Sequence, residues 1–170
     1  FLFRKDGKLH HLEVALKFYL FDPDRQRHGS YFIGPNAADT FERKRDKLLS
    51  KQLPLGRKTF PEIESSRIFL KGILFYPIET EPPSHLPDRM NPQHARGTWF
   101  REGDFQMPFA EGVVALPKPW WVSGEVPSRY GNSSLTIGVP NLLSWPDASC
   151  DERWLRVPSG WPIEASLPSS

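Results

Sequence analysis

The chain of 170 residues carries 22 basic and 20 acidic side chains, which gives a net charge of +2 with neutral histidines. This length suits one domain, or one domain with an appendage, and so small a net charge does not by itself indicate a nucleic-acid partner. The single cysteine, Cys150, excludes an internal disulfide and agrees with a cytoplasmic location, and no apolar run approaches the roughly 18 residues that span a membrane.

The first predicted element is a β-hairpin. Residues 1–5 are apolar and prone to form a strand, Asp6-Gly7 is a strong signal for a two-residue turn, and a long strand over residues 9–21 follows. The chain opens inside an apolar run and without a starting Met. We therefore expect the first strand to be truncated, with Phe1 in its middle.

The long strand alternates between two faces. One face is wholly apolar and is predicted to be buried; it holds Leu12, Val14, Leu16, Phe18 and Leu20. The other face carries both charges of the strand; it holds His11, Glu13, Ala15, Lys17 and Tyr19. Charged side chains are rarely buried without partners. Glu13 and Lys17 therefore need partners if this second face is also covered.

A helix is predicted after a polar loop over residues 22–30 and a short strand over 31–33. Asn36 is its predicted N-cap, with Asp39 three residues on, and the helix should run from Ala37 to Gln52 or Leu53, where Pro54 and Gly56 end it. Its surface is the most basic in the chain, with Arg43, Lys44, Arg45, Lys47 and Lys51. Taken alone, this pattern favours a solvated helix face over a binding surface.

The remainder of the chain shows weaker patterns. Residues 57–66 are predicted to be a polar link, and residues 67–78 a strand with Gly72 as a bulge. A proline-rich irregular stretch follows over 79–96. Short strands are expected at 98–100, 112–116, 120–122 and 135–139, a strand or short helix at 152–157, and a disordered tail at 165–170.

Glu13 and Lys17 on one face of a hairpin strand are typical of a metal-dependent nuclease. In such sites carboxylates hold Mg²⁺, and the lysine with the metal stabilises the extra negative charge on the phosphoryl group. The usual spacing is two residues, whereas here it is four, roughly 13 Å along a strand at about 3.3 Å per residue. An ordinary ion pair between Glu13 and Lys17 on a half-exposed sheet is the alternative.

Four segments together resemble a known family. They are His11-Leu-Glu-Val-Ala-Leu-Lys-Phe-Tyr-Leu20, Gly34-Pro-Asn-Ala-Ala-Asp39, Lys47-Leu-Leu-Ser-Lys-Gln-Leu53 and Lys71-Gly-Ile-Leu-Phe-Tyr-Pro77. In this order they resemble the bacterial domain of unknown function 1853 family, which is similar to the PD-(D/E)XK restriction-endonuclease-like nucleases. The resemblance implies an α/β or α+β fold, with a mixed sheet flanked by helices over residues 1–78 and a Pro- and Trp-rich extension over 79–164.

The resemblance also implies an activity, namely metal-dependent hydrolysis of phosphodiester bonds in DNA. Glu13 matches the metal-binding acid, Lys17 the catalytic lysine and Gln52 a polar position near the site, with Mg²⁺ as the implied cofactor. The family's first-strand acid would lie just before Phe1. The basic helix, through Arg43, Lys44, Lys47 and Lys51, would contact phosphates. Two alternatives stay open: a non-catalytic module that binds nucleic acid or protein, and a purely structural fragment.

Overall fold

The computed structural model describes residues 1–104, 113–117, 121, 137, 139–144 and 153–162. Within them, one mixed sheet of eight strands is combined with one interrupted helix, which confirms the predicted α+β class. The elements are β1 (Leu2–Lys5), β2 (Lys8–Phe21), β3 (Phe32–Ile33), α1 (Phe41–Lys47), a π-helical segment (Leu48–Gln52), α2 (Leu53–Thr59), β4 (Ile63–Pro77), β5 (Ala95–Arg101), β6 (Val114–Ala115), β7 (Asn141–Ser144) and β8 (Trp154–Val157).

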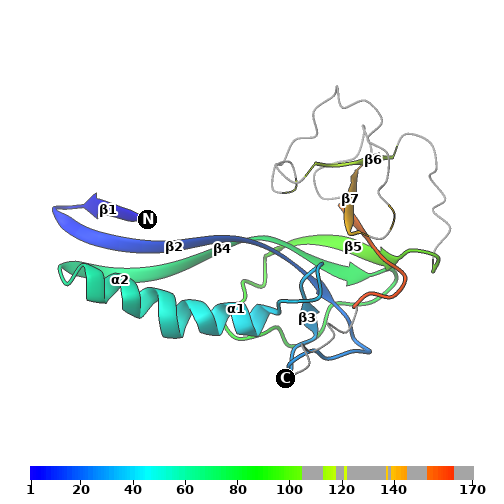
Figure 1. Ribbon diagram of the computed structural model, residues 1–170, viewed down its shortest axis with the longest axis horizontal. Coiled ribbons are helices and arrows are strands. Elements are labelled where there is room, and N and C mark those ends of the chain that lie inside the picture. Colours follow the sequence, from blue (N-terminus) through cyan, green and yellow to red (C-terminus); the bar gives the residue numbers. More distant parts are fainter. Residues whose placement is uncertain (105–112, 118–120, 122–136, 138, 145–152, 163–170) are drawn as a thin grey trace, which may run out of the picture.

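The sheet has the order β1-β2-β4-β5-β8-β7-β6, with β3 paired to the outer edge of β2. Strands β2, β4, β5 and β8 are parallel to their neighbours in this series, while β1, β3, β7 and β6 pair in antiparallel fashion. β5 meets β4 only from Ile73 onward. As Figure 1 shows, β2 and β4 therefore extend as a long arm beyond β5, with β1 paired to β2 at the tip of the arm.

The predicted hairpin is confirmed. Asp6 and Gly7 have φ values of 51° and 76°, the two positive angles that a tight hairpin turn with Asp-Gly requires. The ladder pairs Leu2 with His11, and backbone hydrogen bonds of 2.8 Å in both directions join Phe1 to Leu12. Local turn chemistry was therefore sufficient to locate this element and its register.

The helix begins later and ends later than predicted. Its N-cap is Thr40, whose hydroxyl accepts from the Arg43 N–H, and the Asn36 side chain instead accepts from the Ala38 N–H in a local turn. The helix continues through Pro54 to Thr59. Proline interrupts a regular helix because its ring clashes with the carbonyl one turn earlier. The π-helical segment immediately before α2 widens that turn, so the helix passes the proline.

The helix covers the opposite face of β2 from the one we expected to be buried. Two helix residues pack onto the charged face. The ring centroids of Phe41 and Tyr19 are 5.8 Å apart, and Gly56 lies directly over the His11 ring. On the other face, Val14 and Leu16 are 36% and 53% exposed. The prediction of a wholly buried apolar face is therefore wrong along the arm. It holds only near the end of β2, where Leu20 is fully buried.

β4 also differs from its prediction. It starts at Ile63, so that the predicted polar link over 57–66 is divided between the end of α2 and the start of this strand. Gly72 is not a bulge, because the pairing with β2 is regular there and the irregularity lies at Leu9 and His10. A Cβ atom at Gly72 would stand 1.5 Å from the Lys17 carbonyl oxygen. Glycine is required at this position because the two strands approach so closely.

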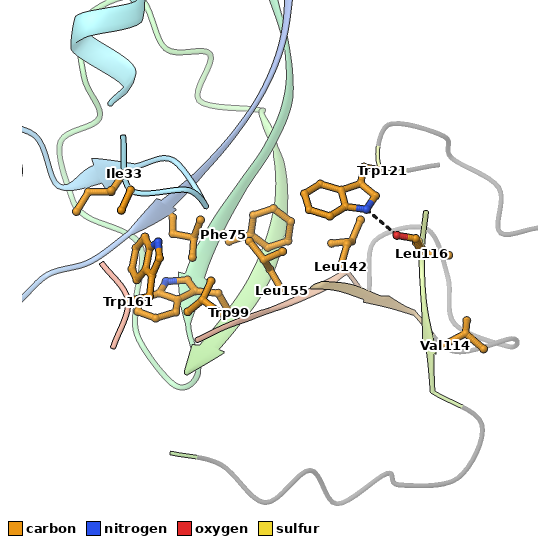
Figure 2. Packing of buried hydrophobic residues seen from close by; sticks show 12 residues of the cluster. Ile33, Phe75, Trp99, Val114, Leu116, Trp121, Leu142, Leu155 and Trp161 are labelled. Atoms are coloured by element: carbon orange, nitrogen blue, oxygen red, sulfur yellow. Dashed lines mark hydrogen bonds between the residues drawn. The ribbon is translucent and has the colours of Figure 1, made fainter. Parts of the chain in front are cut away.

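The main core lies where the arm joins the body of the sheet. Figure 2 shows Ile33, Phe75, Leu155 and the paired indoles of Trp99 and Trp161, whose ring centroids are 5.0 Å apart. Trp121 closes the far side and donates from its indole N–H to the Leu116 carbonyl at 2.7 Å. One core therefore joins the end of β2 and the short strand β3 to the C-terminal strands.

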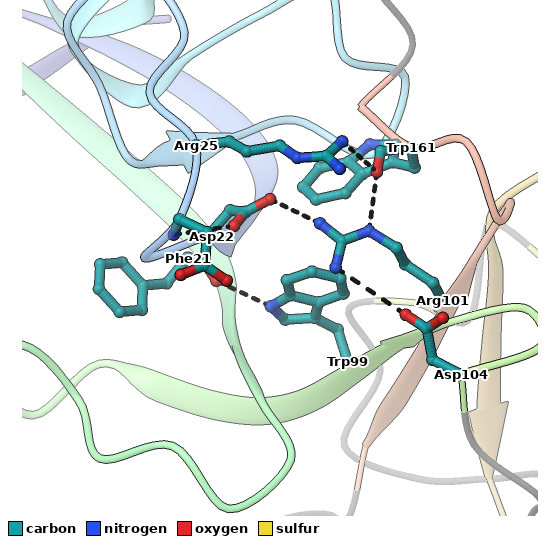
Figure 3. Close-up of polar contacts among 8 residues, drawn as sticks. Phe21, Asp22, Arg25, Trp99, Arg101, Asp104 and Trp161 are labelled. Atoms are coloured by element: carbon teal, nitrogen blue, oxygen red, sulfur yellow. Dashed lines mark hydrogen bonds and ion pairs between the residues drawn. The ribbon is translucent and has the colours of Figure 1, made fainter.

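A buried polar cluster links the loop after β2 to β5. Asp22 is 1% exposed, and its Oδ2 accepts from Arg101 Nη2 at 2.8 Å (Figure 3). The Arg101 guanidinium lies 4.8 Å from the Trp99 ring centroid, and its Nε donates to the Trp161 carbonyl at 2.9 Å. The buried carboxylate is thus neutralised by a guanidinium that is itself held by a backbone carbonyl.

Some of the strands predicted after residue 90 are confirmed, and others are not. β5, β6 and β8 fall within the expected ranges or extend them, and residues 154–157 form a strand, not a helix. β7 was not predicted. Most of the ranges 120–122 and 135–139, and the tail at 165–170, lie outside the described residues. Parallel and antiparallel pairing over such short strands depends on long-range contacts, so weak local patterns could not have placed them.

Candidate functional site

The helix-covered face of β2 carries a row of polar side chains. His11 is at one end, 6% exposed, and its Nε2 lies 2.9 Å from Oε1 of Glu13. A Cβ atom at Gly56 would approach the His11 ring within 2.5 Å, so the helix presses directly on the imidazole. The ring is therefore fixed, and with it the orientation of the Glu13 carboxylate.

At the other end of the row, Lys17 and Asp39 form an ion pair of 2.6 Å. Asp39 precedes the helix in the loop after β3, and Lys17 projects from β2. The same carboxylate oxygen lies 3.5 Å from the Tyr19 hydroxyl. Burial raises the pKa of Tyr19 strongly, and the Asp39 charge adds to this effect because it disfavours a phenolate.

Each charge in the row thus has its own partner. Glu13 is bonded to His11 and Lys17 to Asp39, and among the described residues no ion pair joins Glu13 to Lys17. The alternative of a simple Glu13–Lys17 surface ion pair is therefore wrong. The two residues share a covered face, as the alternation along β2 predicted, but they act as two separate polar pairs.

Helix spacing puts Gln52 on the side of the helix that packs against β2. It lies one helical turn from both Leu48, which is buried, and Gly56, which covers His11. With about 1.5 Å of rise per helical residue and about 3.3 Å per strand residue, this places Gln52 roughly opposite Glu13. Its Oε1 is buried and has no hydrogen-bond partner among the described residues. An unsatisfied buried acceptor of this kind indicates a place for a donor.

The basic residues of the helix lie mostly on its outer side. Arg43, Lys47 and Lys51 are exposed at four-residue intervals and form one stripe, while Lys44 is half-buried beside it. Residues spaced by four lie above one another on a helix. The stripe therefore presents three cations in line to the solvent, on the side of the helix away from the β2 row.

Sequence reasoning missed Asp39 as a member of this row, and it missed the contact between His11 and Glu13. Asp39 appeared as a helix-capping acid, and only the fold brings it beside Lys17. His11 was placed on this face of the strand without an assigned partner. Its spacing of two from Glu13 placed both side chains on one strand face, and this was a local signal that the two could pair.

The row offers few protein ligands to a metal ion. Within the described residues, no three His, Cys, Asp or Glu side chains are grouped so as to hold one. Mg²⁺ keeps several waters and often takes only one or two protein carboxylates together with substrate phosphates. Glu13 is partly exposed and uses one oxygen for His11. Its chemistry therefore suits a single-carboxylate ligand.

Comparisons with known proteins give one match. The family model described as Domain of unknown function (DUF1853) matches residues 1–137. No curated protein and no solved structure matches the chain. Among the described residues, no helix is long and apolar enough to cross a membrane.

Proposed function

The chain belongs to the family of domains of unknown function 1853, and from the row on β2 we propose that it is a metal-dependent nuclease, related to the restriction-endonuclease-like enzymes and acting on DNA. One observation carries this proposal. Glu13 and Lys17 lie on the same covered face of β2, each oriented by a partner. A fixed carboxylate and a fixed ammonium on one strand face are the groups that phosphodiester hydrolysis uses.

In this proposal Glu13 would hold the Mg²⁺, which lowers the pKa of a bound water and offsets phosphate charge. His11 orients the Glu13 carboxylate through its 2.9 Å contact. Water adds to the phosphorus, the bond to the leaving sugar oxygen breaks, and that oxygen takes up a proton. Lys17 stabilises the added negative charge, and because an ammonium has three donors it can do so while still bonded to Asp39.

The hairpin register specifies where a further acid would contribute. β1 pairs with β2 so that Leu2 faces His11, and Phe1 is bonded to Leu12. In a longer chain, a residue directly before Phe1 would therefore pair with Glu13. Directly opposed residues of an antiparallel pair share a face. An acid there would lie beside Glu13 on the same face of the sheet.

The test is cleavage of labelled DNA in Mg²⁺ by the wild-type chain and by the variants Glu13→Gln and Lys17→Met. We expect each variant to lower the cleavage rate by about 100-fold or more, the range for losing one group that stabilises transition-state charge. Lys8→Gln is the matched control, because Lys8 lies on the same strand in an exposed ion pair with Glu64. Unchanged cleavage by folded Glu13→Gln would overturn the proposal.

A non-catalytic DNA-binding module is the second candidate, and the basic stripe on the helix supports it. For duplex DNA, removing one cation that neutralises a phosphate should flatten the dependence of log K on log salt by about 0.9. We expect Lys47→Gln and Lys51→Gln each to reduce this slope by about that amount. Salt-dependent binding without cleavage in Mg²⁺ or Mn²⁺ would favour the module over the nuclease.

A further inference from the structure

A cavity of about 320 Å³ opens beside the polar row. It lies between the helix, the part of β4 that β5 does not reach, and the loop over residues 89–94. Lys17 and Tyr19 form its end toward β2, and Gly72 forms the floor next to Lys17. The cavity exists because β4 has no strand neighbour on this side before Ile73. Lys17 therefore belongs both to the proposed catalytic row and to this cavity.

The charges that line the cavity are of one sign. Three cationic side chains line it on the helix side, namely Lys17, Arg45 and Arg89, and no aspartate or glutamate does. Lys71 also borders the cavity, but it pairs with Leu16 in the sheet, so its side chain belongs to the opposite face. The chain as a whole carries nearly equal numbers of basic and acidic side chains, so this imbalance is local. The carboxylates paired with Lys17, Arg45 and Arg89 lie outside the lining. A concave site lined by cations concentrates anions.

The walls between these cations are apolar. Leu49 comes from the helix, Ile68 and Leu70 from β4, and Met90 from the loop. The volume lies near the lower limit of the roughly 300 to 1,000 Å³ that small-molecule sites occupy. An occupant must therefore combine a compact apolar or planar body with a negative charge, and a double helix is far too wide to enter.

We propose that this cavity takes one unstacked base of single-stranded DNA, with the adjoining phosphate against Lys17 and Arg45. This rests on the proposed nuclease function and specifies its substrate as a strand with an unpaired nucleotide. Proteins that recognise single strands stack splayed bases on aromatic side chains and read their edges by hydrogen bonds. Tyr19 and Phe41 are aromatic residues that line this cavity. Asn91 and His94 supply polar groups on the loop side for such contacts.

The experiment measures the affinity of the full chain for a fluorescent single-stranded oligonucleotide and for the blunt duplex of the same sequence, without divalent metal. Leu49→Trp fills the cavity. We expect it to weaken single-strand binding about tenfold, equivalent to about 1.4 kcal/mol, and to leave duplex binding unchanged. Leu16→Trp is the matched control, because Leu16 is exposed on the opposite face of the arm. It should change neither affinity.

Arg89→Gln is the second variant, and it leaves the apolar walls intact. Arg89 is exposed and paired only loosely, at 3.5 Å, with exposed Asp88. We expect Arg89→Gln also to decrease the affinity for the single strand selectively. In a separate competition experiment with the wild-type chain, a nucleoside monophosphate should displace the oligonucleotide, and inorganic phosphate at the same concentration should not. Equal decreases on single strand and duplex, or equal displacement by inorganic phosphate, would overturn the base pocket.

The two proposals fail in different ways. Duplex cleavage that depends on Glu13, without any preference for single strands, would support the nuclease proposal and overturn the base pocket. If Leu49→Trp abolishes a preference for single strands but no metal ion supports cleavage, the base pocket is supported and the nuclease proposal is overturned. Displacement of the oligonucleotide by a fatty acid but not by the nucleotide would show a different anionic occupant and overturn the inference.

Discussion

The Nζ atom of Lys17 lies 2.6 Å from Oδ2 of Asp39, a residue 22 positions away in the sequence, and the pair is about two-thirds buried. Asp39→Asn removes the charge but keeps the shape. We expect it to lower the free energy of unfolding by about 1 to 3 kcal/mol, because a partly buried ammonium loses its charged partner. Urea unfolding of both proteins measures this change.

The ion pair between Lys8 and Glu64 is the internal control for that prediction. It is of similar length, 2.8 Å, but both side chains are more than half exposed. Exposed pairs contribute little because water screens them. Glu64→Gln should therefore leave the free energy of unfolding unchanged within the error of the measurement. Equal effects of the two substitutions would show that the Lys17 pair is no better shielded.

Gly56 and His11 give a prediction in which an ordinarily stabilising change has the opposite sign. Gly→Ala within a helix usually adds about 1 kcal/mol. Here the new Cβ would meet the His11 ring at 2.5 Å. We expect Gly56→Ala to destabilise the fold by about 1 to 3 kcal/mol, the range for overpacking. Thermal unfolding tests this in two pairs of proteins. Gly56→Ala should be less stable than the wild type, whereas in the His11→Ala background the same change should be stabilising, because the ring that it meets is gone.

Arg101 and Asp22 predict a large effect in the body of the sheet. Arg101→Met would leave the buried Asp22 carboxylate without its cation, at a cost of about 3 to 5 kcal/mol. The double variant with Asp22→Asn should recover part of that stability, because the isolated charge is gone. Denaturant unfolding of the two single variants and the double variant forms a complete cycle, and additive effects would contradict a direct coupling.

His94 predicts a pH dependence. Burial lowers the pKa of this imidazole from 6.5, Arg96 lowers it further, and the Asn91 carbonyl partly offsets both. Its Nε2 is also 2.8 Å from the Tyr76 hydroxyl. Near pH 6.5 the unfolded chain therefore binds more protons than the folded one, so stability falls as the pH drops through this value. The free energy of unfolding of wild type minus that of His94→Gln, followed from about pH 8 to pH 5, should decrease.

Local signals predicted several elements well. Asp6-Gly7 specified the hairpin because few residues accept two successive positive φ angles, and the alternation along residues 9–21 specified which side chains share a face. The basic helix was predicted in its place, although Thr40 and Thr59, not Asn36 and Gln52, mark its limits. These successes depend on contacts between residues close in sequence.

The candidate site was predictable only in part. Glu13 and Lys17 could be placed together because a strand has a fixed period. Asp39 could not, because its contact with Lys17 needs the loop after β3 to fold back onto β2. The π-helical segment that extends the helix past Pro54 likewise has no simple local signature. The local patterns at Asn36 and Pro54 therefore did not set the two ends of the helix.

The sequence by itself determined that β2 has two chemically different faces, because backbone geometry sends alternate side chains to opposite sides. Only the tertiary structure decided which face is covered. The helix docks where Phe41 meets Tyr19 and Gly56 meets His11, and so it encloses the charged face and leaves Leu16 exposed. Periodicity is a local property of the chain, whereas burial depends on which distant surface packs against it.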